Sequence, residues 1–196
     1  MANATADYGF VPLYSLSGDI RNINCAVLAA ATDLYVGDPV KFSGTGDSSG
    51  RPSITRADAG DDTVMGVIIG FKASGPDNLN QMYSTGADTA IVTPTLAHTV
   101  FRVNAGGTTG VDLNDIGNCF NHVYAAGDAL TGKSGCYIDS TTAATTGTTW
   151  RLIGFADRPD NEFSATVSTD TLDTDILVTC VESIWVGHNG TGGDGV

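Results

Sequence analysis

The sequence predicts an all-β fold, a β-sandwich or barrel (jelly-roll-like) with at most one short helix. Apolar segments are short and recur about every 10–15 residues, close to the spacing of strands in such folds. Turn-forming residues separate these segments, including 25 glycines in a chain of 196 residues. No long amphipathic helical period is present, so helices are not expected to build the core.

Local patterns predict the individual elements. Residues 63–71, Thr-Val-Met-Gly-Val-Ile-Ile-Gly-Phe, give the strongest buried-strand signal because they are almost continuously apolar. Residues 98–104 alternate between two faces, as a strand does. Residues 150–155 and 175–186 are also rich in strand-forming side chains. Residues 111–126 are the best helix candidate, although a glycine interrupts them.

The chain is expected to contain an N-terminal arm or edge strand (1–22), a single β domain (23–186) and a flexible Gly-rich tail (187–196). The apolar segment 8–16 contains Pro12, which disfavours a central strand. We expect this segment to pack on a neighbouring chain, because an extended strand can add to a partner's sheet edge. The alternative is an ordinary first strand in the chain's own sheet. The candidate capsid or oligomer contact residues are Tyr8, Phe10, Val11, Leu13 and Tyr14.

A weak internal repeat is visible. Residues 35–40, Tyr-Val-Gly-Asp-Pro-Val, are similar to residues 124–130, Tyr-Ala-Ala-Gly-Asp-Ala-Leu, and Ile-Gly-Phe occurs at both 69–71 and 153–155. One interpretation is chance. The other is two similar β-units, each opening with a Gly-Asp turn and closing with a glycine after a core strand, where glycine permits a β-bulge or a close backbone approach.

The charge balance argues against nucleic acid and membranes as partners. The chain has 22 acidic and 9 basic side chains, for a net charge of −13, and its Lys and Arg residues form no run. Phosphate contacts need clustered Lys and Arg, and an acidic surface is repelled by DNA and anionic membranes. The N-terminus shows no secretory signal pattern and no apolar run reaches transmembrane length. We therefore expect synthesis in the cytosol.

The chemistry-bearing residues predict no enzyme and neither a cofactor nor a metal. The sequence contains no nucleophile elbow, P-loop or metalloprotease motif. Cys119 and His122 could share a helix face as a thiol–imidazole pair, but an ordinary buried cysteine beside a surface histidine is the favoured interpretation. The four cysteines form no Cys-x-x-Cys motif and are expected to be free, buried thiols: Cys25, Cys119, Cys136 and Cys180.

Two further features have a structural and a binding interpretation. The acidic clusters at 58–62 and 170–175 could hold Ca²⁺, but solvated turns are the favoured interpretation, because neither cluster matches an EF-hand loop. Trp150 and Trp185 could form a sugar-binding platform. Both lie in apolar strand patterns, so core packing is favoured for both.

Several fragments occur in an order that resembles a known family. They are Gly-Asp-Pro-Val at 37–40, Arg-Ala-Asp-Ala-Gly-Asp at 56–61, Met-Gly-Val-Ile-Ile-Gly-Phe at 65–71, Val-Phe-Arg-Val at 100–103, Ala-Gly-Asp at 126–128, Leu-Thr-Gly-Lys-Ser at 130–134, and Arg-Leu-Ile-Gly-Phe-Ala-Asp-Arg-Pro-Asp-Asn at 151–161. Over most of residues 33–161, this order resembles the capsid decoration (cement) proteins of tailed bacteriophages, especially those of podovirus-like marine phages. The fragments are turns and strands, not active-site signatures.

The resemblance implies a protein on the outer surface of an icosahedral head, in the virion, where it strengthens the joints between capsomers. It implies the major capsid protein as partner and a homotrimer as the oligomeric state. An alternative from another class is a tail, fibre or receptor-binding β-module that binds a ligand such as a glycan.

Overall fold

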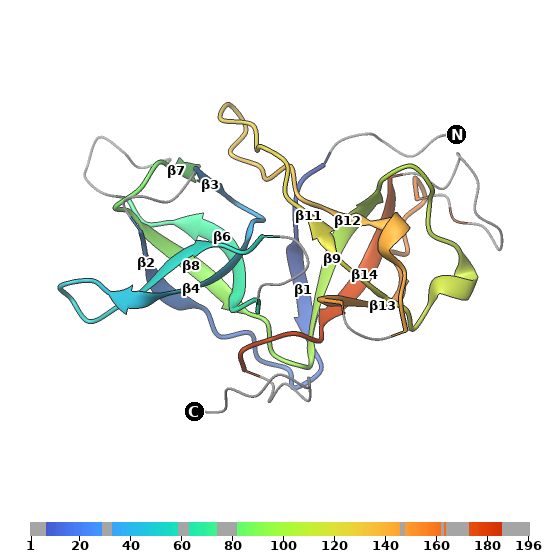
Figure 1. The fold of residues 1–196 in the computed structure, drawn as a ribbon, viewed down its shortest axis with the longest axis horizontal. Helices are drawn as coiled ribbons and strands as arrows, with labels where there is room; N and C mark the ends of the chain where they lie inside the picture. Colours follow the sequence, from blue (N-terminus) through green and yellow to red (C-terminus); the bar gives the residue numbers. More distant parts are fainter. Residues whose placement is uncertain are drawn as a thin grey trace.

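A computed structural model describes residues 7–28, 33–58, 63–73, 82–145, 148–161, 163 and 173–185, and these form a nearly all-β protein, as predicted. Figure 1 shows two β lobes side by side, with the N-terminal strand between them. The strands are β1 (Val11–Ser15), β2 (Ile23–Val27), β3 (Leu34–Tyr35), β4 (Pro39–Gly46), β5 (Pro52–Arg56), β6 (Gly66–Phe71), β7 (Tyr83–Ser84), β8 (Thr89–Pro94), β9 (Thr99–Gly106), β10 (Cys119–Phe120), β11 (His122–Val123), β12 (Tyr137–Asp139), β13 (Trp150–Phe155) and β14 (Thr174–Cys180). Two 3-10 turns, η1 (Leu113–Asp115) and η2 (Ser140–Thr142), complete the described elements.

The first lobe is a closed barrel of five strands in the order β2-β5-β4-β6-β8. We call it the first barrel. Its core is aliphatic and consists of Cys25, Val27, Leu34, Val40, Ile54, Met65, Ile68, Ala90 and Val92. A small separate ladder, β3 with β7, lies beside it.

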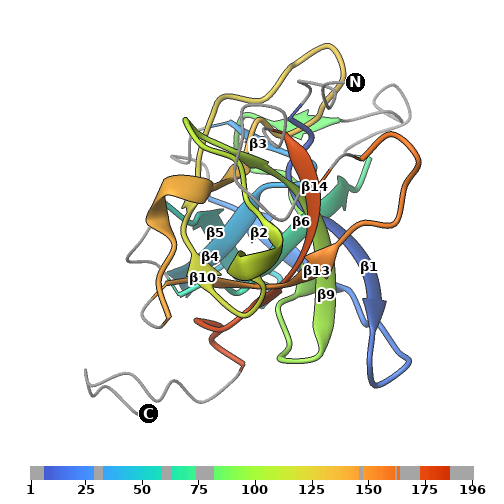
Figure 2. The ribbon, with the colours of Figure 1, turned by 90° about the vertical axis from the view of Figure 1, so that its right-hand side faces the viewer.

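The second lobe is a curved sheet in the order β10-β13-β14-β9-β12-β11, which we call the second barrel (Figure 2). Its two end strands, β10 and β11, are separated only by Asn121, so one short segment contributes both ends and the sheet curls back toward itself. Its core is larger and more aromatic, with Phe10, Phe101, Phe120 and Trp150 among its buried members. Ala57, Val64 and Val67 of the first lobe also pack into this core, so the two barrels share apolar contacts.

The two barrels repeat one topology. In chain order, β2, β4, β5, β6 and β8 correspond to β9, β10–β11, β12, β13 and β14. In the first barrel, β2 pairs antiparallel with β8 and parallel with β5. In the second, β9 pairs antiparallel with β14 and parallel with β12. The remaining antiparallel pairs also correspond, which supports the interpretation of the repeat as two similar β-units.

The Ile-Gly-Phe repeat marks a bulge at the same place in each barrel. The β6–β8 register shifts between Ile68 and Gly70, and the β13–β14 register shifts between Leu152 and Gly154. A bulge inserts one unpaired residue and bends the strand, and glycine accommodates that geometry. A bulge is therefore present next to each of these glycines, and the unpaired residues are Ile69 and Ile153.

The Gly-Asp half of the repeat is corrected by the structure. The equivalent of Gly37 is Gly117, because both have left-handed backbones, with φ of 101° and 96°. The amide of Gly37 donates to the carbonyl of Ile68 at 2.8 Å, and that of Gly117 donates to the carbonyl of Leu152 at 2.9 Å. Gly117 is followed by asparagine and not by aspartate, so the Gly-Asp dipeptide does not identify the equivalent position.

The second Gly-Asp, at 127–128, belongs to a hairpin instead. We call residues 47–51, between β4 and β5, the first hairpin, and residues 124–136, between β11 and β12, the second hairpin. Asp47 and Asp128 open the two turns in the same way, because each side chain accepts from the amide two residues later, that of Ser49 or Leu130. The closing bonds differ, since Gly50 donates to a carbonyl three residues earlier and Gly132 to one four residues earlier. Gly50 and Gly132 both have positive φ. The hairpins are therefore equivalent, and the second is longer.

The predicted helix at 111–126 is wrong except for the single 3-10 turn η1. Asp112 starts it, with its side chain accepting from the amide of Asn114 and its own amide donating to Asp115. The left-handed Gly117 then ends it, and Cys119 enters the ladder with β13. The cap at Asp112 thus starts one helical turn. The helix cannot continue, because Gly117 ends it and the next residues pair as a strand.

Other predictions have mixed outcomes. The strands predicted at 63–71, 98–104, 150–155 and 175–186 are present as β6, β9, β13 and β14, with shorter or shifted ends. All four cysteines are free and buried, as predicted. The tail at 187–196 lies outside the described residues. The division into an arm and a single β domain stays a prediction, to which the structure adds two barrels within residues 23–185.

The equivalence of Gly37 and Gly117 predicts unequal effects of the same substitution. At either position alanine would adopt a left-handed backbone, which costs about 1–2 kcal/mol. At Gly37 the new Cβ would also lie 2.7 Å from the carbonyl oxygen of Tyr8, whereas at Gly117 nothing lies within 4 Å. We expect Gly37→Ala to lower the melting temperature by several degrees more than Gly117→Ala, measured by calorimetry. Equal losses would contradict the close packing around Gly37.

Candidate interaction surface

The N-terminal segment is a strand of the chain's own sheet. β1 pairs antiparallel with β9, with Val11 opposite Arg102 and Ser15 opposite Thr99. Figure 2 shows β1 along the outside of β9. The register shifts between Pro12 and Tyr14, so a bulge accommodates the proline region at this edge of the sheet. In the single chain, this agrees with the alternative of an ordinary first strand.

Phe10 lies in the protein's own core. Its side chain is 1% exposed and stacks on Trp150 with ring centroids 4.3 Å apart. An aromatic pair in this position contributes about 0.5–1.5 kcal/mol beyond the burial of apolar area. Phe10 is therefore not available as a partner contact, which corrects its place among the candidate contact residues.

The other candidate contact residues are more exposed. Tyr8 and Val11 are partly buried, while Leu13 and Tyr14 are 41% and 44% exposed. Leu16, which follows the strand, is 77% exposed. Leu13 is the extra residue of the bulge, and a bulge re-aims side chains, so neighbouring Leu13 and Tyr14 both reach solvent. We call Leu13, Tyr14 and Leu16 the β1 face.

A hydrogen-bond network around Asp175 fixes the chain just before β1. The Tyr8 hydroxyl donates to one carboxylate oxygen of Asp175 at 2.7 Å, and the Arg158 guanidinium donates to the other at 2.7 Å. Asn104 also donates to Asp175 at 3.0 Å. Burial, followed by these contacts with the Asp175 carboxylate, raises the pKa of Tyr8 well above its ordinary value. The network and the Phe10 stack together anchor the chain immediately before the β1 face.

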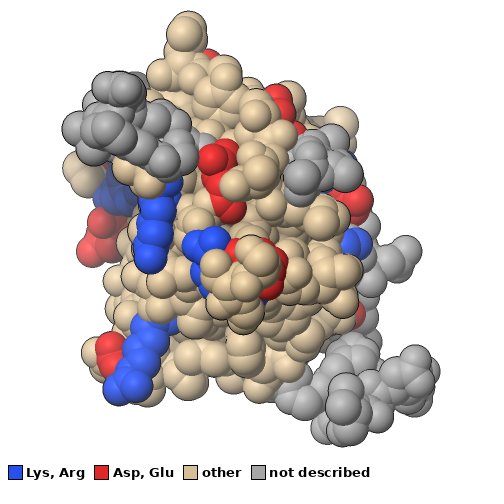
Figure 3. Space-filling model, turned by 90° about the vertical axis from the view of Figure 1, so that its left-hand side faces the viewer, with Lys and Arg blue, Asp and Glu red and all other residues tan. Residues whose placement is uncertain are grey.

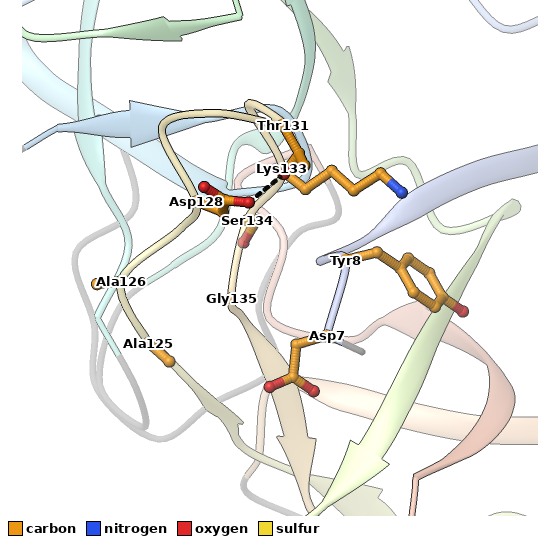
Figure 4. Close-up of a pocket in the computed structure, with 9 residues that line it drawn as sticks. All are labelled: Asp7, Tyr8, Ala125, Ala126, Asp128, Thr131, Lys133, Ser134 and Gly135. Carbon is orange, nitrogen blue, oxygen red and sulfur yellow. Dashed lines mark hydrogen bonds between the residues drawn. The ribbon is translucent and has the colours of Figure 1, made fainter. Parts of the chain in front are cut away.

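A pocket of about 420 Å³ lies between this segment and the second hairpin (Figure 4). Its lining residues are Asp7, Tyr8, Ala125, Ala126, Asp128, Thr131, Lys133, Ser134 and Gly135. Asp128 is engaged by its own turn, where it accepts from the amide of Leu130 at 2.8 Å and from the hydroxyl of Thr131 at 3.0 Å. The Asp7 carboxylate points away from Lys133 in Figure 4. The lining therefore gives a polar junction and does not converge on one reacting atom.

A buried carboxyl lies at the contact between the barrels. Asp38, immediately before β4, is fully buried and accepts hydrogen bonds from the Tyr35 amide at 2.9 Å and from the Cys136 thiol at 3.5 Å. Burial raises its pKa to about 6, although these hydrogen bonds and one from Ser134 act in the opposite direction. Burial likewise raises the pKa of the Cys136 thiol far above its ordinary value, so this thiol is not a nucleophile.

His122 has a structural role and is not on the surface, contrary to the sequence interpretation. It is fully buried, and its Nδ1 accepts from the Trp150 indole N–H at 3.2 Å. Its Nε2 lies 3.0 Å from the carbonyl oxygen of Ala57, which fits a neutral ring that carries its proton on Nε2. Both ring nitrogens are occupied, so a catalytic pair with Cys119 is not supported.

The two tryptophans differ. Trp150 is fully buried, as predicted, but Trp185 is 44% exposed, so core packing was the wrong expectation for it. Trp185 lies beyond the end of β14; its indole N–H donates to the carbonyl of Met65 at 2.6 Å and its ring meets Phe42 edge to face. It is held in place but leaves much of its ring open to solvent.

The acidic clusters show no cation site in the part that can be described. Asp58 forms an ion pair with Arg56 at 2.7 Å, and residues 59–62 and 170–172 lie outside the described part. Among the described residues, no group of three or more His, Cys, Asp or Glu side chains is placed to hold a metal ion. Within the same residues, no helix has the length and apolar character needed to cross a membrane.

The raised pKa of Asp38 predicts a pH-dependent stability. A folded-state pKa of about 6, against 3.8 for an ordinary carboxyl, means that folding favours the protonated form. The stabilisation of the folded state that protonated Asp38 provides is fully present below pH 3.8, and it is lost as the pH rises through about 6. Asp38→Asn removes this titration, so the stability of the variant relative to wild type should rise by on the order of 2–3 kcal/mol between about pH 4 and about pH 7.

Urea unfolding at a series of pH values measures this difference. Parallel stability profiles for the two proteins across that range would contradict a raised pKa at Asp38.

Comparison with known proteins does not place the chain in a family. No protein-family model matches it, no curated protein matches it, and no solved structure matches it.

Proposed function

We propose that the protein is a capsid decoration protein that binds the outer surface of a tailed-phage head and stabilises the joints between capsomers. Its partner is the major capsid protein, and its location is the virion surface. The observation that carries this proposal is the β1 face, a solvent-exposed apolar surface on and just after a strand that is paired with β9. The sequence resemblance supplies the class of particle.

The motifs that carry the resemblance have architectural roles in this fold. Residues 37–40 form the turn into β4, residues 65–71 contain the bulged strand β6, and residues 151–155 lie in its counterpart β13. These are positions that determine how two barrels are built and joined. Such positions fit a family whose members have a common scaffold and a common binding surface, and not a common catalytic reaction.

The β1 face has the properties that a docking surface needs. Pre-organised apolar side chains lose little conformational entropy on binding, so more of the gain from burying them remains as affinity. Burial of apolar surface is worth about 25 cal/mol per Å². A single such contact is modest, but a decoration protein repeats it at many capsomer joints. Binding to the assembled shell alone then stabilises the shell by mass action.

Charge favours an apolar contact over a polar one. A net charge of −13 makes burial of unpaired carboxylates expensive, so the contact should exclude them. Figure 3 shows one face of the first barrel, where basic and acidic atoms are scattered among uncharged ones without a continuous basic area. This face offers no surface of the kind that DNA binding requires.

A glycan-binding tail or fibre module is the second candidate, and Trp185 is the observation that favours it. Exposed tryptophan rings present a flat apolar surface with a polar edge, which suits recognition of sugars. The indole N–H of Trp185 already donates to the chain's own backbone, so the ring offers a stacking face without its usual donor. The β1 face involves more apolar residues, and for that reason we place it first.

Replacing the β1 face should abolish the stabilising effect. We expect the triple variant Leu13→Ser, Tyr14→Ser, Leu16→Ser to bind purified heads at least about tenfold more weakly, since a loss of 1.4 kcal/mol is tenfold in affinity. Heads mixed with it should release DNA on heating at the temperature of undecorated heads. Leu130→Ser is the control, because Leu130 is 91% exposed on the second hairpin, away from the β1 face. Equal release temperatures for bare and wild-type-decorated heads would refute the cement role.

Trp185→Ala separates the two candidate functions. A decoration protein should bind heads with this variant as it does with the wild type, because the side chain lies outside the β1 face. A glycan-binding module should instead lose retention on an array of immobilised bacterial surface glycans. Retention of the wild type on such an array, together with its loss in Trp185→Ala, would support the second candidate over the first.

A further inference from the structure

We propose that the protein associates head to tail, with the first hairpin of one copy seated on the second barrel of the next. The surface that receives it, which we call the open edge, consists of Leu113, Ile116, Gly117 and Ile153. The inference rests on the duplication of the barrel and does not depend on the capsid as partner.

The chain already contains one contact of this kind, between its own barrels. The second hairpin lies on the first barrel, where the amide of Val36 donates to the carbonyl of Gly132 at 3.0 Å and the amide of Ser134 donates to the carbonyl of Val36 at 2.9 Å. The backbones approach closely, since a Cβ on Gly127 would overlap the ring of Tyr35. A hairpin of one barrel thus adds a short parallel bridge to the other.

The equivalent place on the second barrel is open. Ile116 precedes Gly117 as Val36 precedes Gly37, and Ile116 is 48% exposed while Val36 is partly covered. A Cβ on Gly37 would meet Tyr8, Gly9 and Ser134, whereas a Cβ on Gly117 would meet nothing within 4 Å. Two more apolar side chains of the open edge are exposed: Leu113 in η1 at 41% and Ile153 in β13 at 40%.

The equivalent hairpin of the first barrel is also open. Its turn is capped by an aspartate side chain as that of the second hairpin is, and Cβ atoms on Gly44 and Gly50, at its base and within it, would meet nothing within 4 Å. Figure 1 shows this hairpin projecting from the end of the first barrel, while η1 lies at the far end of the second. One chain cannot bring the two together, so the hairpin that fits the open edge comes from a second copy.

The chemistry of the two open surfaces is compatible. In the contact between copies, Ile116 would take the place of Val36, and Gly50 the place of Gly132. Arg51 follows Gly50 and is already paired with Asp47 of its own hairpin, so the contact adds no unpaired charge. Pro52 follows Arg51 and lacks the amide that Ser134 uses, so the contact between copies has one hydrogen bond fewer than the contact within the chain. It is heterologous, and such contacts build closed rings or filaments.

Ile116→Asp should break the association. A carboxylate placed in the buried contact weakens it by at least about tenfold, which corresponds to 1.4 kcal/mol. Sedimentation velocity of the purified full-length protein over a concentration series should show oligomers for wild type and monomers for this variant. Leu130→Asp is the matched control, because it adds the same charge at another exposed apolar site and should leave the oligomer intact. The melting temperature of each variant checks that it is folded.

Disulfide trapping identifies the surfaces themselves. Ser48→Cys places a thiol on the first hairpin and Leu113→Cys places one beside the open edge, while the four native cysteines are buried. A mixture of the two single variants should form a cross-linked dimer on mild oxidation, and each variant alone should form far less. A wild-type protein that stays monomeric, or an oligomer that Ile116→Asp leaves intact and that yields no mixed cross-link, overturns the proposal.

The outcome is separate from that of the capsid proposal. Oligomers that fail to bind heads would reject the decoration function and keep the head-to-tail contact. Monomers that bind and stabilise heads would reject the head-to-tail contact and keep the decoration function. In that case the open edge would be free to contact the capsid protein.

Discussion

The contact of Gly9 and Phe10 with Gly37 holds the two barrels together. The amide of Phe10 donates to the carbonyl of Gly37 at 2.9 Å, and neither Gly9 nor Gly37 has room for a Cβ. The ring of Phe10 enters the second core while its backbone bonds to the first barrel, so one residue belongs to both. The position of β1, and with it the exposure of Leu13 and Tyr14, depends on this contact.

Duplication explains why the molecule has two unlike ends. Two units with one topology expose equivalent surfaces, but only one copy of each surface can be covered by the contact between them. The second hairpin covers the edge at Val36, which leaves the first hairpin and the edge at Ile116 exposed. The difference between the two exposed ends therefore follows from joining two units of one topology side by side. It would arise even if the strands of the two units were identical.

The sequence predicted what local physics determines. The fold class and the long strands follow from side-chain alternation, and the repeated Ile-Gly-Phe fragments mark the places where both barrels carry a bulge. The match of Gly37 to Gly127 failed because a Gly-Asp pair suits several turns. Gly117, its true counterpart, lacks the aspartate, and only strand register reveals the equivalence.

The candidate site was predictable only in part, because an apolar pattern does not say which surface it is buried against. Phe10 and Leu13 are both apolar and three residues apart, yet one is in the core and the other faces solvent. The bulge that re-aims Leu13 and the core position that accepts Phe10 depend on β9 and Trp150, which are distant in sequence. For the same reason the pattern at 175–186 did not reveal that Trp185 lies beyond the strand end.

Rigidity links the structure to the proposed role. A cement protein stabilises a shell only by the difference between its affinity for the assembled shell and for separate capsomers, so its surfaces must keep a fixed geometry. Here the β1 face is fixed by an aromatic stack and a carboxylate network, and the open edge is fixed by strand pairing on β13. A flexible apolar arm would lose more conformational entropy on binding, which would weaken its contact with the shell. The enclosed Phe10 therefore supports a contact role for its exposed neighbours better than a free arm would.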